Sequence, residues 1–218
     1  MPQDPFGAFF YLFVVLWFIR MWGRDLLEAR ADPEQIGKGL PGAAPCPASA
    51  IVVAVAGTLA LLAAETYGEI RLGIADEQTD VSWCMLPAFV AAAFAEEFVF
   101  RGFLVVESRG AAAKWLSVVA FSALFALVHP YLWSFDWDAA GEDASLFARV
   151  AEGFSPHFTG KAFFTTAFLF AGSLWFYFVR FFRLNPHASL LAPFAAHLAK
   201  NLAVFAVKLA QGHVVSFF

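Results

Sequence analysis

The chain has 218 residues, the size of one domain or one helical bundle, and 61% of them are hydrophobic, including 28 phenylalanines. Because the mean hydropathy is +0.67 and long apolar stretches recur along the whole chain, a polytopic membrane protein is predicted. No basic tract accompanies the net charge of −4, which argues against a nucleic-acid partner, and Cys46 and Cys84 form no close pair for a disulfide or metal site.

Residues 1–82 are predicted to hold two membrane spans and a connector. The first span runs from Phe6 to about Trp22, with aromatic residues at both edges, as in interfacial belts. No lysine or arginine precedes it, so we expect a retained span and not a cleaved secretory signal. A connector rich in glycine and proline occupies residues 23–49, and the second span runs from about Ser49 to Tyr67.

Residues 83–210 are predicted to form the core of the protein, with four further spans and one insertion. The spans are expected over about 83–107, 113–133, 162–182 and 188–210. The insertion, residues 134–160, is acidic on balance, and its 144–154 part is a candidate interfacial amphipathic helix. Its acidic residues are Asp136, Asp138, Glu142, Asp143 and Glu152. The predicted fold is therefore an all-α, polytopic transmembrane helix bundle of about six spans.

The distribution of basic residues predicts the orientation of this bundle, because lysine and arginine are enriched in cytoplasmic loops. Basic residues in or beside the loops of one side are Arg20, Arg24, Arg30, Lys38, Arg109, Lys114, Arg180 and Arg183. Those of the other side are Arg71, Arg149, Lys161 and Lys208. The first side holds the excess, so both termini are predicted to lie outside.

Glu96, Glu97 and Arg101 place three ionisable groups within a run that is otherwise apolar from Met85 to Val106. Each such group costs at least about 2.5–3.5 kcal/mol at bilayer depth, so an intramembrane charge indicates a functional site. Glu97 and Arg101 are four residues apart and can pair on one face of a helix. Glu96 lies about 100° from Glu97 and about 140° from Arg101 around a helix, so it lacks a local partner and is the first candidate for chemistry.

Two further apolar spans carry polar residues. His129 is four residues after Phe125, whose ring can pack against the imidazole, and His197 is four residues before Asn201. Because lipid cannot solvate these groups, they are expected to face the bundle interior or a wet cavity. One acid, two imidazoles and one amide on three helices form a set that can activate water and stabilise an oxyanion.

Each of these residues also has a purely structural interpretation. His129, next to Pro130, fits a residue at the membrane interface, and Asn201 fits an interhelical hydrogen bond. The Glu97–Arg101 pair fits an architectural role, in which it holds its helix and shapes the electric field around the neighbouring carboxylate. The combination of residues, more than any one of them, indicates catalysis.

The three polar sites resemble, in order and placement, the motifs of the CPBP family (CAAX prenyl proteases and bacteriocin-processing proteins, the Abi group) of intramembrane endopeptidases. Residues 95–102 (AEEFVFRG) are similar to its E-E-x-x-x-R signature, and residues 125–129 (FALVH) to its F-x-x-x-H motif. Residues 189–201 (SLLAPFAAHLAKN) are similar to its H-x-x-x-N motif and the run before it. The resemblance covers about residues 83–205 and implies a CAAX-protease-like core.

The resemblance implies hydrolysis of a peptide bond within the membrane. It assigns activation of the attacking water to Glu96 and His129. It assigns stabilisation of the oxyanion to His197 and Asn201. The residues that would support the first two motifs are Glu97, Arg101 and Phe125.

The resemblance leaves open whether a metal is required, because the family has been described both as metalloproteases and as metal-free glutamic proteases. Glu96, His129 and His197 would supply a plausible zinc site with two histidines and one glutamate. However, H-E-x-x-H is absent from the chain. If Glu96 were a ligand, only Glu97, already paired with Arg101, would remain as a base. The metal-free interpretation is favoured, so no cofactor is expected, with zinc as the alternative.

The partners implied are membrane lipid and a protein or peptide with a membrane-associated tail. This tail would be a prenylated C-terminus, a bacteriocin leader or a sorting tail, and the sequence does not choose among them. The compactness of the chain suggests a prokaryotic inner membrane. The alternatives are a non-catalytic immunity or scaffold protein of the same fold, which predicts the loss of a motif residue, and a proton-coupled transporter, which predicts paired repeats.

Overall fold

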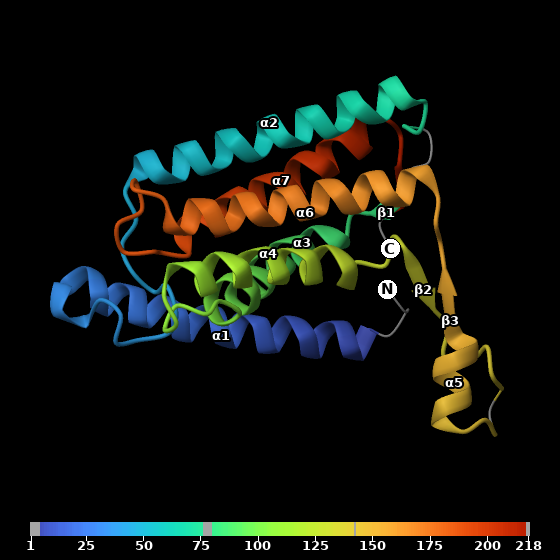
Figure 1. Ribbon diagram of the computed structural model, residues 1–218, viewed down its shortest axis with the longest axis horizontal. Helices are drawn as coiled ribbons and strands as arrows, with labels where there is room; N and C mark the ends of the chain where they lie inside the picture. The colour runs from blue at the N-terminus through green and yellow to red at the C-terminus, as the bar shows by residue number, and fades with distance from the viewer. Residues whose placement is uncertain (1–4, 76–79, 142, 217–218) are drawn as a thin grey trace.

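The computed structural model describes residues 5–75, 80–141 and 143–216, most of them in helices that run along a common direction (Figure 1). Glu142, one of the acidic residues of the insertion, lies outside these ranges. The α-helices are α1 (Pro5–Ala31), α2 (Ala48–Leu72), α3 (Met85–Glu96), α4 (Ala111–Val128), α5 (Leu146–Gly153), α6 (Gly160–Phe181) and α7 (Leu191–Ala210). A 3-10 helix, η1 (Pro33–Gln35), follows α1, and a π-helix, η2 (Glu97–Phe103), follows α3.

Among the described residues, three helices are long and apolar enough to cross a membrane, namely α2, α4 and α6. They support a mainly helical, integral membrane protein, whereas the predicted number of about six spans is not confirmed. The predicted third span is divided, because α3 ends at Glu96 after 12 residues and the chain continues as η2. The predicted fourth span ends early, because α4 stops at Val128 and His129 takes an extended conformation before Pro130.

Four short strands depart from the all-α prediction. β1 (Val81–Ser82) pairs in parallel with β4 (Val214–Ser216), and β2 (Trp133–Phe135) pairs antiparallel with β3 (Phe154–Pro156). The second pair is the base of a projection that carries α5, and we call residues 133–156 the arm. Figure 1 shows the arm at one end of the bundle, the same end at which α1 begins and β1 lies.

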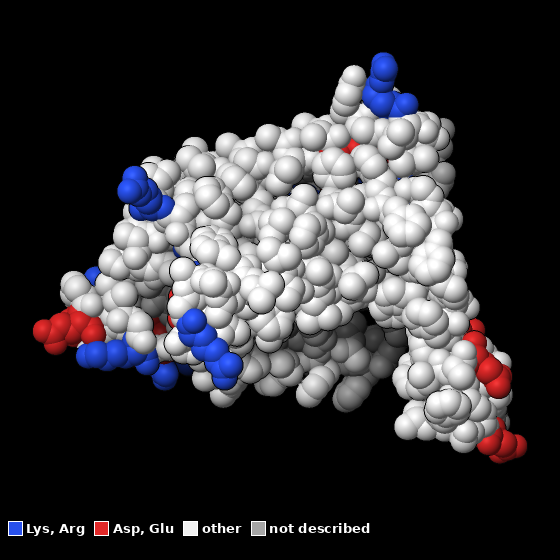
Figure 2. Space-filling model, in the orientation of Figure 1, with Lys and Arg blue, Asp and Glu red and all other residues white. Residues whose placement is uncertain are grey.

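Charged side chains are distributed unequally over the two ends of the bundle. In the view of Figure 2, blue lysine and arginine side chains gather mainly at the end opposite the arm, with one further group near the end of α2. Red aspartate and glutamate side chains mark the outer edge of the arm. The orientation with both termini outside, which rests on the same basic residues, stays a prediction.

Helices α2 and α6 are in close contact. Trp175 of α6 donates its indole N–H to the carbonyl oxygen of Ala54 on α2, at 3.0 Å. The ring also lies against Gly57, where a Cβ atom would be only 2.1 Å from Trp175 Cζ2. Glycine is therefore needed at position 57 because the backbone of one helix meets a large ring of the other.

Replacing Gly57 with alanine is expected to push α2 and α6 apart and to lower the melting temperature by about 5 °C, since overpacking of this kind costs about 1–3 kcal/mol. The measurement is thermal unfolding in detergent. Gly23→Ala in α1 is the matched control, because no atom lies within 4 Å of its Cβ position and alanine favours a helix. Equal melting temperatures for the two variants would contradict this packing argument.

The turn before α7 is held by a buried amide. Asn185 Nδ2 donates to the carbonyl oxygens of Val179, Arg180 and Ser189, and its Oδ1 accepts from the backbone N–H of Ser189. Ser189 then donates its hydroxyl to the carbonyl oxygen of Ala44, in the connector after α1. These bonds fix the start of α7, and with it the position of the residues one to three turns further on.

Candidate active site

The first candidate motif lies at the junction of α3 with η2. Glu96 is the last residue of α3, whereas Glu97 and Arg101 belong to the π-helix. Tyr177 of α6 braces this π-helix, since its hydroxyl lies 2.6 Å from the carbonyl oxygen of Phe100 and 2.7 Å from that of Leu104. π-helical turns are rare and are frequent at functional sites. The sequence analysis treated residues 83–107 as one regular span and did not predict this segment.

Glu96, His129 and His197 converge at one point between α3, α4 and α7. Glu96 Oε2 lies 3.9 Å from His129 Nε2 and 3.7 Å from His197 Nε2. Both distances exceed a direct hydrogen bond, and each is short enough for one water molecule to bridge Glu96 Oε2 to that ring. Glu96 Oε2 is buried and makes no hydrogen bond within the described part of the chain, so it is free to accept one from such a water.

The two histidines present the same ring nitrogen to Glu96. His129 Nδ1 lies 2.7 Å from the carbonyl oxygen of Phe125, and His197 Nδ1 lies 2.8 Å from Glu97 Oε1. A carbonyl oxygen only accepts hydrogen bonds, so His129 carries a proton on Nδ1, and an ionised Glu97 places one on His197 Nδ1 in the same way. In the neutral rings, Nε2 of each therefore faces Glu96 with its lone pair.

Aromatic rings fix the orientation of both imidazoles. The ring of Phe125 lies 4.7 Å from that of His129, in the contact that their spacing predicts. The ring of Phe176, on α6, stacks on His197 with centroids 5.0 Å apart and planes 19° apart. The three side chains differ in their exposure to solvent: those of Glu96 and His129 are 29% and 27% exposed, and that of His197 is only 8% exposed.

Arg101 and Glu97 form the buried base of the site. Their charged groups lie 3.1 Å apart with both side chains fully buried, so the pair forms as the spacing predicts. Arg101 also donates to Ser173 Oγ at 2.7 Å, and its guanidinium lies 4.4 Å from the ring centre of Phe125. Because Glu97 contacts both Arg101 and His197, it connects the ion pair to a candidate catalytic ring.

Residues of α6 complete this base, and the sequence analysis did not single them out. They are Ser173, Phe176 and Tyr177. With Arg180 they recur at helical spacing along one face of the predicted fifth span, and two of the four are polar in an otherwise apolar stretch. This helical spacing of polar residues in an apolar span is the sequence pattern that could have indicated a role for this face of α6 in the site.

Asn201 lies one helical turn beyond His197 on α7. Its Nδ2 donates to the carbonyl oxygen of Phe89 on α3, at 3.1 Å, which is the interhelical contact weighed above. The preceding residue, Lys200, pairs with Glu65 of α2 at 3.6 Å. Asn201 retains a second amide hydrogen with no bond among the described residues, so this contact leaves one donor for another role.

Two of the separations among the three converging atoms are wider than those between the ligands of a zinc ion. In a tetrahedral zinc site with bonds of about 2.0–2.1 Å, ligand atoms lie about 3.4 Å apart. The separations here are 3.7 and 3.9 Å, and no group of three or more His, Cys, Asp or Glu in the described ranges forms a metal site as placed. Cys46 and Cys84 are both free thiols, as the sequence predicts.

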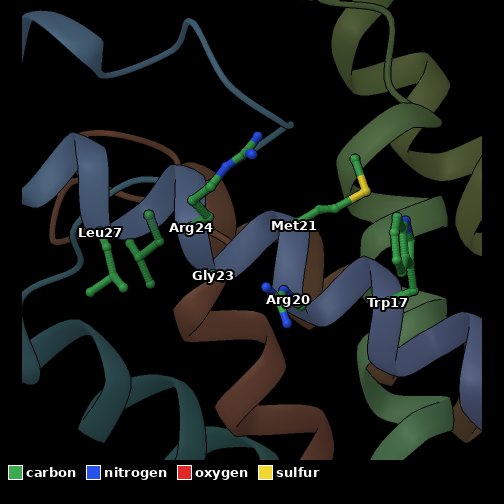
Figure 3. Close-up of a pocket in the computed structure, with 7 residues that line it drawn as sticks. Trp17, Arg20, Met21, Gly23, Arg24 and Leu27 are labelled. Carbon is green, nitrogen blue, oxygen red and sulfur yellow. The ribbon is translucent and has the colours of Figure 1, made fainter.

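A surface hollow elsewhere on the bundle contains none of these residues (Figure 3). All of its lining comes from α1, namely Trp17, Arg20, Met21, Gly23, Arg24, Leu26 and Leu27. A hollow lined by a single helix is a feature of its outer surface. The candidate site residues lie instead between α3, α4, α6 and α7.

Comparison with known proteins identifies the family. The family model described as type II CAAX prenyl endopeptidase Rce1-like matches residues 78–203, a range that includes every candidate catalytic residue. No curated protein and no solved structure matches the chain. Together with the three apolar helices, this match supports an integral membrane protein of a protease family that acts on membrane-associated proteins. The chain belongs to the Rce1-like family of type II CAAX prenyl endopeptidases.

Proposed function

We propose that this protein is a metal-free intramembrane endopeptidase in which Glu96 and His129 activate a water molecule. The observation that carries the proposal is the approach of Glu96 Oε2 to Nε2 of both His129 and His197, at 3.9 and 3.7 Å. The three groups lie in or at the end of three separate helices, and the side chains of Glu96 and His129 are partly accessible. Such an arrangement favours general-base catalysis of hydrolysis over a purely structural role.

The reaction begins when Glu96 takes one proton from the water while His129 Nε2 accepts a hydrogen bond from it. The water oxygen forms a bond to the scissile carbonyl carbon, and the carbonyl oxygen becomes an oxyanion. The C–N bond then breaks, and the proton held by Glu96 goes to the leaving amine. The first products are a carboxylic acid and an amine, and transfer of the acid's proton to the amine then gives a carboxylate and an ammonium group, so atoms and charges balance.

Stabilisation of the oxyanion is assigned to His197 and Asn201. When His197 also carries a proton on Nε2, Glu97 at its Nδ1 stabilises the imidazolium, and Nε2–H becomes a donor to the oxyanion. The second amide hydrogen of Asn201 supplies the other donor. Arg101 holds Glu97 in place and balances its charge.

The substrate class proposed first is a protein tail with a prenylated cysteine near its C-terminus, because the matching family is one of CAAX prenyl endopeptidases. A bacteriocin leader and a sorting tail are the other candidates, and a prokaryotic inner membrane is the proposed location. The test uses the full chain in lipid vesicles with an internally quenched peptide that carries a farnesylated CaaX end. Cleavage at a single bond, identified by mass spectrometry, is expected. No cleavage of this peptide, of a leader peptide or of a sorting-tail peptide would favour a non-catalytic protein.

Replacing His129 with alanine is expected to lower the rate of peptide cleavage about a hundred-fold, since it removes one of two groups that orient the water. The measurement is the initial rate at saturating peptide. His187→Ala is the matched control, because His187 is exposed in the turn before α7 and should leave the rate unchanged. Equal rates for the two variants would remove His129 from the mechanism.

Removing divalent metal ions is expected to leave the cleavage rate unchanged, because no step of the proposed reaction passes through a metal. The protein is dialysed against a zinc chelator, assayed, and analysed for bound metal. Zinc present at one equivalent, with activity lost to the chelator and regained on adding zinc, would overturn the metal-free proposal in favour of the zinc alternative.

A further inference from the structure

The arm is tied at both ends to helices that are apolar and long enough to span a membrane. β2 begins at Trp133, shortly after α4 ends at Val128, and β3 ends at Pro156, shortly before α6 begins at Gly160. The indole N–H of Trp133 also donates to the carbonyl oxygen of Leu127, in the last turn of α4, at 2.7 Å. The base of the arm must therefore lie at the level where α4 and α6 leave the membrane.

From this base the arm extends across the direction of the bundle helices and beyond their outline (Figure 1). Its internal packing is local, since β2 pairs with β3 and α5 lies at the end of this pair that points away from the bundle (Figure 1). Gly153, at the end of α5, is buried so closely that a Cβ there would lie 2.5 Å from the carbonyl oxygen of Asp136. An element that leaves two spans sideways at their common end lies along the membrane surface.

The arm has an apolar face without a partner in the described protein. Leu146, Phe147 and Val150 recur at helical spacing along α5, whereas Phe154, which follows in β3, stacks on Trp133. Phe147 is 84% exposed and Leu146 is 70% exposed. Trp137, just after β2, and Phe158, between β3 and α6, are also exposed, and aromatic side chains of this kind are enriched where membrane meets water.

Acidic residues lie on the other side of the arm. Glu152 is about 140° or more around the helix from Phe147 and Val150, and Asp136, Asp138 and Asp143 are exposed. Figure 2 shows red side chains along the edge of the arm that faces away from the bundle, whereas its remaining visible surface is white. The charge is thus on the side that a membrane would leave in water.

We propose that the arm binds the surface of the same membrane that holds the bundle, with Leu146, Phe147 and Val150 in the boundary between headgroups and acyl chains. Its acidic side then faces the aqueous phase. Lipid is the partner of this apolar face for two reasons. The base of the arm is fixed at the membrane boundary by two spans, and the apolar residues lie on the side towards the membrane while the acidic residues lie on the side away from it. The inference does not depend on the proposed catalytic reaction.

The consequence for the site follows from the chain path. His129 lies between the end of α4 and the base of the arm, four residues before Trp133. An arm held at the lipid surface therefore fixes the depth of His129, and it places the partly exposed side of the site next to the headgroup region. A membrane-attached substrate tail would reach it from there.

The test is a spin-label measurement on the full chain in vesicles of phosphatidylcholine and phosphatidylglycerol. Cys46 and Cys84 are first replaced by alanine, and single cysteines are then introduced as Phe147→Cys, Val150→Cys or Glu152→Cys, all at exposed positions of α5. Each is labelled with a nitroxide. Collision with oxygen, which concentrates in lipid, is compared with collision with a water-soluble nickel chelate.

Labels at 147 and 150 are expected to show an oxygen-to-nickel collision ratio several-fold higher than the label at 152. Equal ratios at the three positions would overturn the proposal, since the arm would then lie in water. Low collision with both probes, together with dipolar broadening between labels, would overturn it in favour of contact between two copies. A high ratio that appears only after the farnesylated peptide is added would overturn it in favour of a substrate-binding surface. No outcome depends on turnover, so the result is separate from that of the proposed function.

Discussion

Replacing Glu96 with glutamine is expected to reduce peptide cleavage at least about a thousand-fold, which corresponds to about 4 kcal/mol of lost transition-state stabilisation. Glutamine keeps the shape of the side chain but cannot accept a proton from water. Glu96 Oε2 has no hydrogen bond within the described part of the chain, so the substitution removes no contact that holds the fold together. The measurement is the initial cleavage rate of the farnesylated peptide in vesicles, with thermal unfolding as a check on folding.

Glu34→Gln is the matched control for this experiment. Glu34 is an exposed carboxylate in η1, away from α3, α4 and α7, and its loss is expected to leave cleavage unchanged. A Glu96→Gln protein that is folded and retains more than about a tenth of the wild-type rate would rule out Glu96 as the base. A loss of rate accompanied by a lower melting temperature would instead indicate that Glu96 has a structural role.

Replacing Arg101 with methionine is expected to destabilise the protein by about 3–5 kcal/mol and to lower its melting temperature on the order of 10 °C. The cause is the charge that remains, because Glu97 is fully buried and the loss of Arg101 removes its permanent cation and leaves only His197 beside it. Ser173 Oγ loses its partner as well. The measurement is thermal unfolding in detergent, followed by circular dichroism.

Two further variants separate this charge effect from a loss of packing. The double variant Arg101→Met with Glu97→Gln removes the unbalanced charge and is expected to recover part of the lost stability. Arg109→Met, at an exposed position after η2, is expected to change stability by less than about 0.5 kcal/mol. If the double variant is no more stable than Arg101→Met alone, the ion pair is not what holds this part of the fold.

Much of the candidate site was predictable from the sequence, because lipid cannot solvate polar side chains and those in apolar helices must therefore face the interior of the bundle. Glu96, His129 and His197 each interrupt a long apolar run, and burial against lipid requires them to turn inward. The pairing of Glu97 with Arg101 followed from their spacing alone. The catalytic roles of these residues stay predictions, which the variants above test.

Other parts of the site depended on contacts that spacing does not encode. The contact of Glu97 with His197 joins residues 100 positions apart and depends on how α7 is set against η2. The π-helix adds a residue to one turn, and no period in the sequence marks it. The strands of the arm are two or three residues long, too short for an alternating pattern to be recognised.

The connector after α1 contacts the residue that precedes α7, the helix that carries His197 and Asn201. Leu190 donates its backbone N–H to the carbonyl oxygen of Gly42, at 3.0 Å, and Gly42 has a φ of +63°, with no space for a Cβ beside Leu190. Gly42 lies outside residues 78–203, the part that matches the family. The part of the chain that matches the family is therefore positioned in part by a segment that carries none of the family motifs. A shortened protein that keeps only residues 78–203 would retain the candidate catalytic side chains but lose this contact at the start of α7.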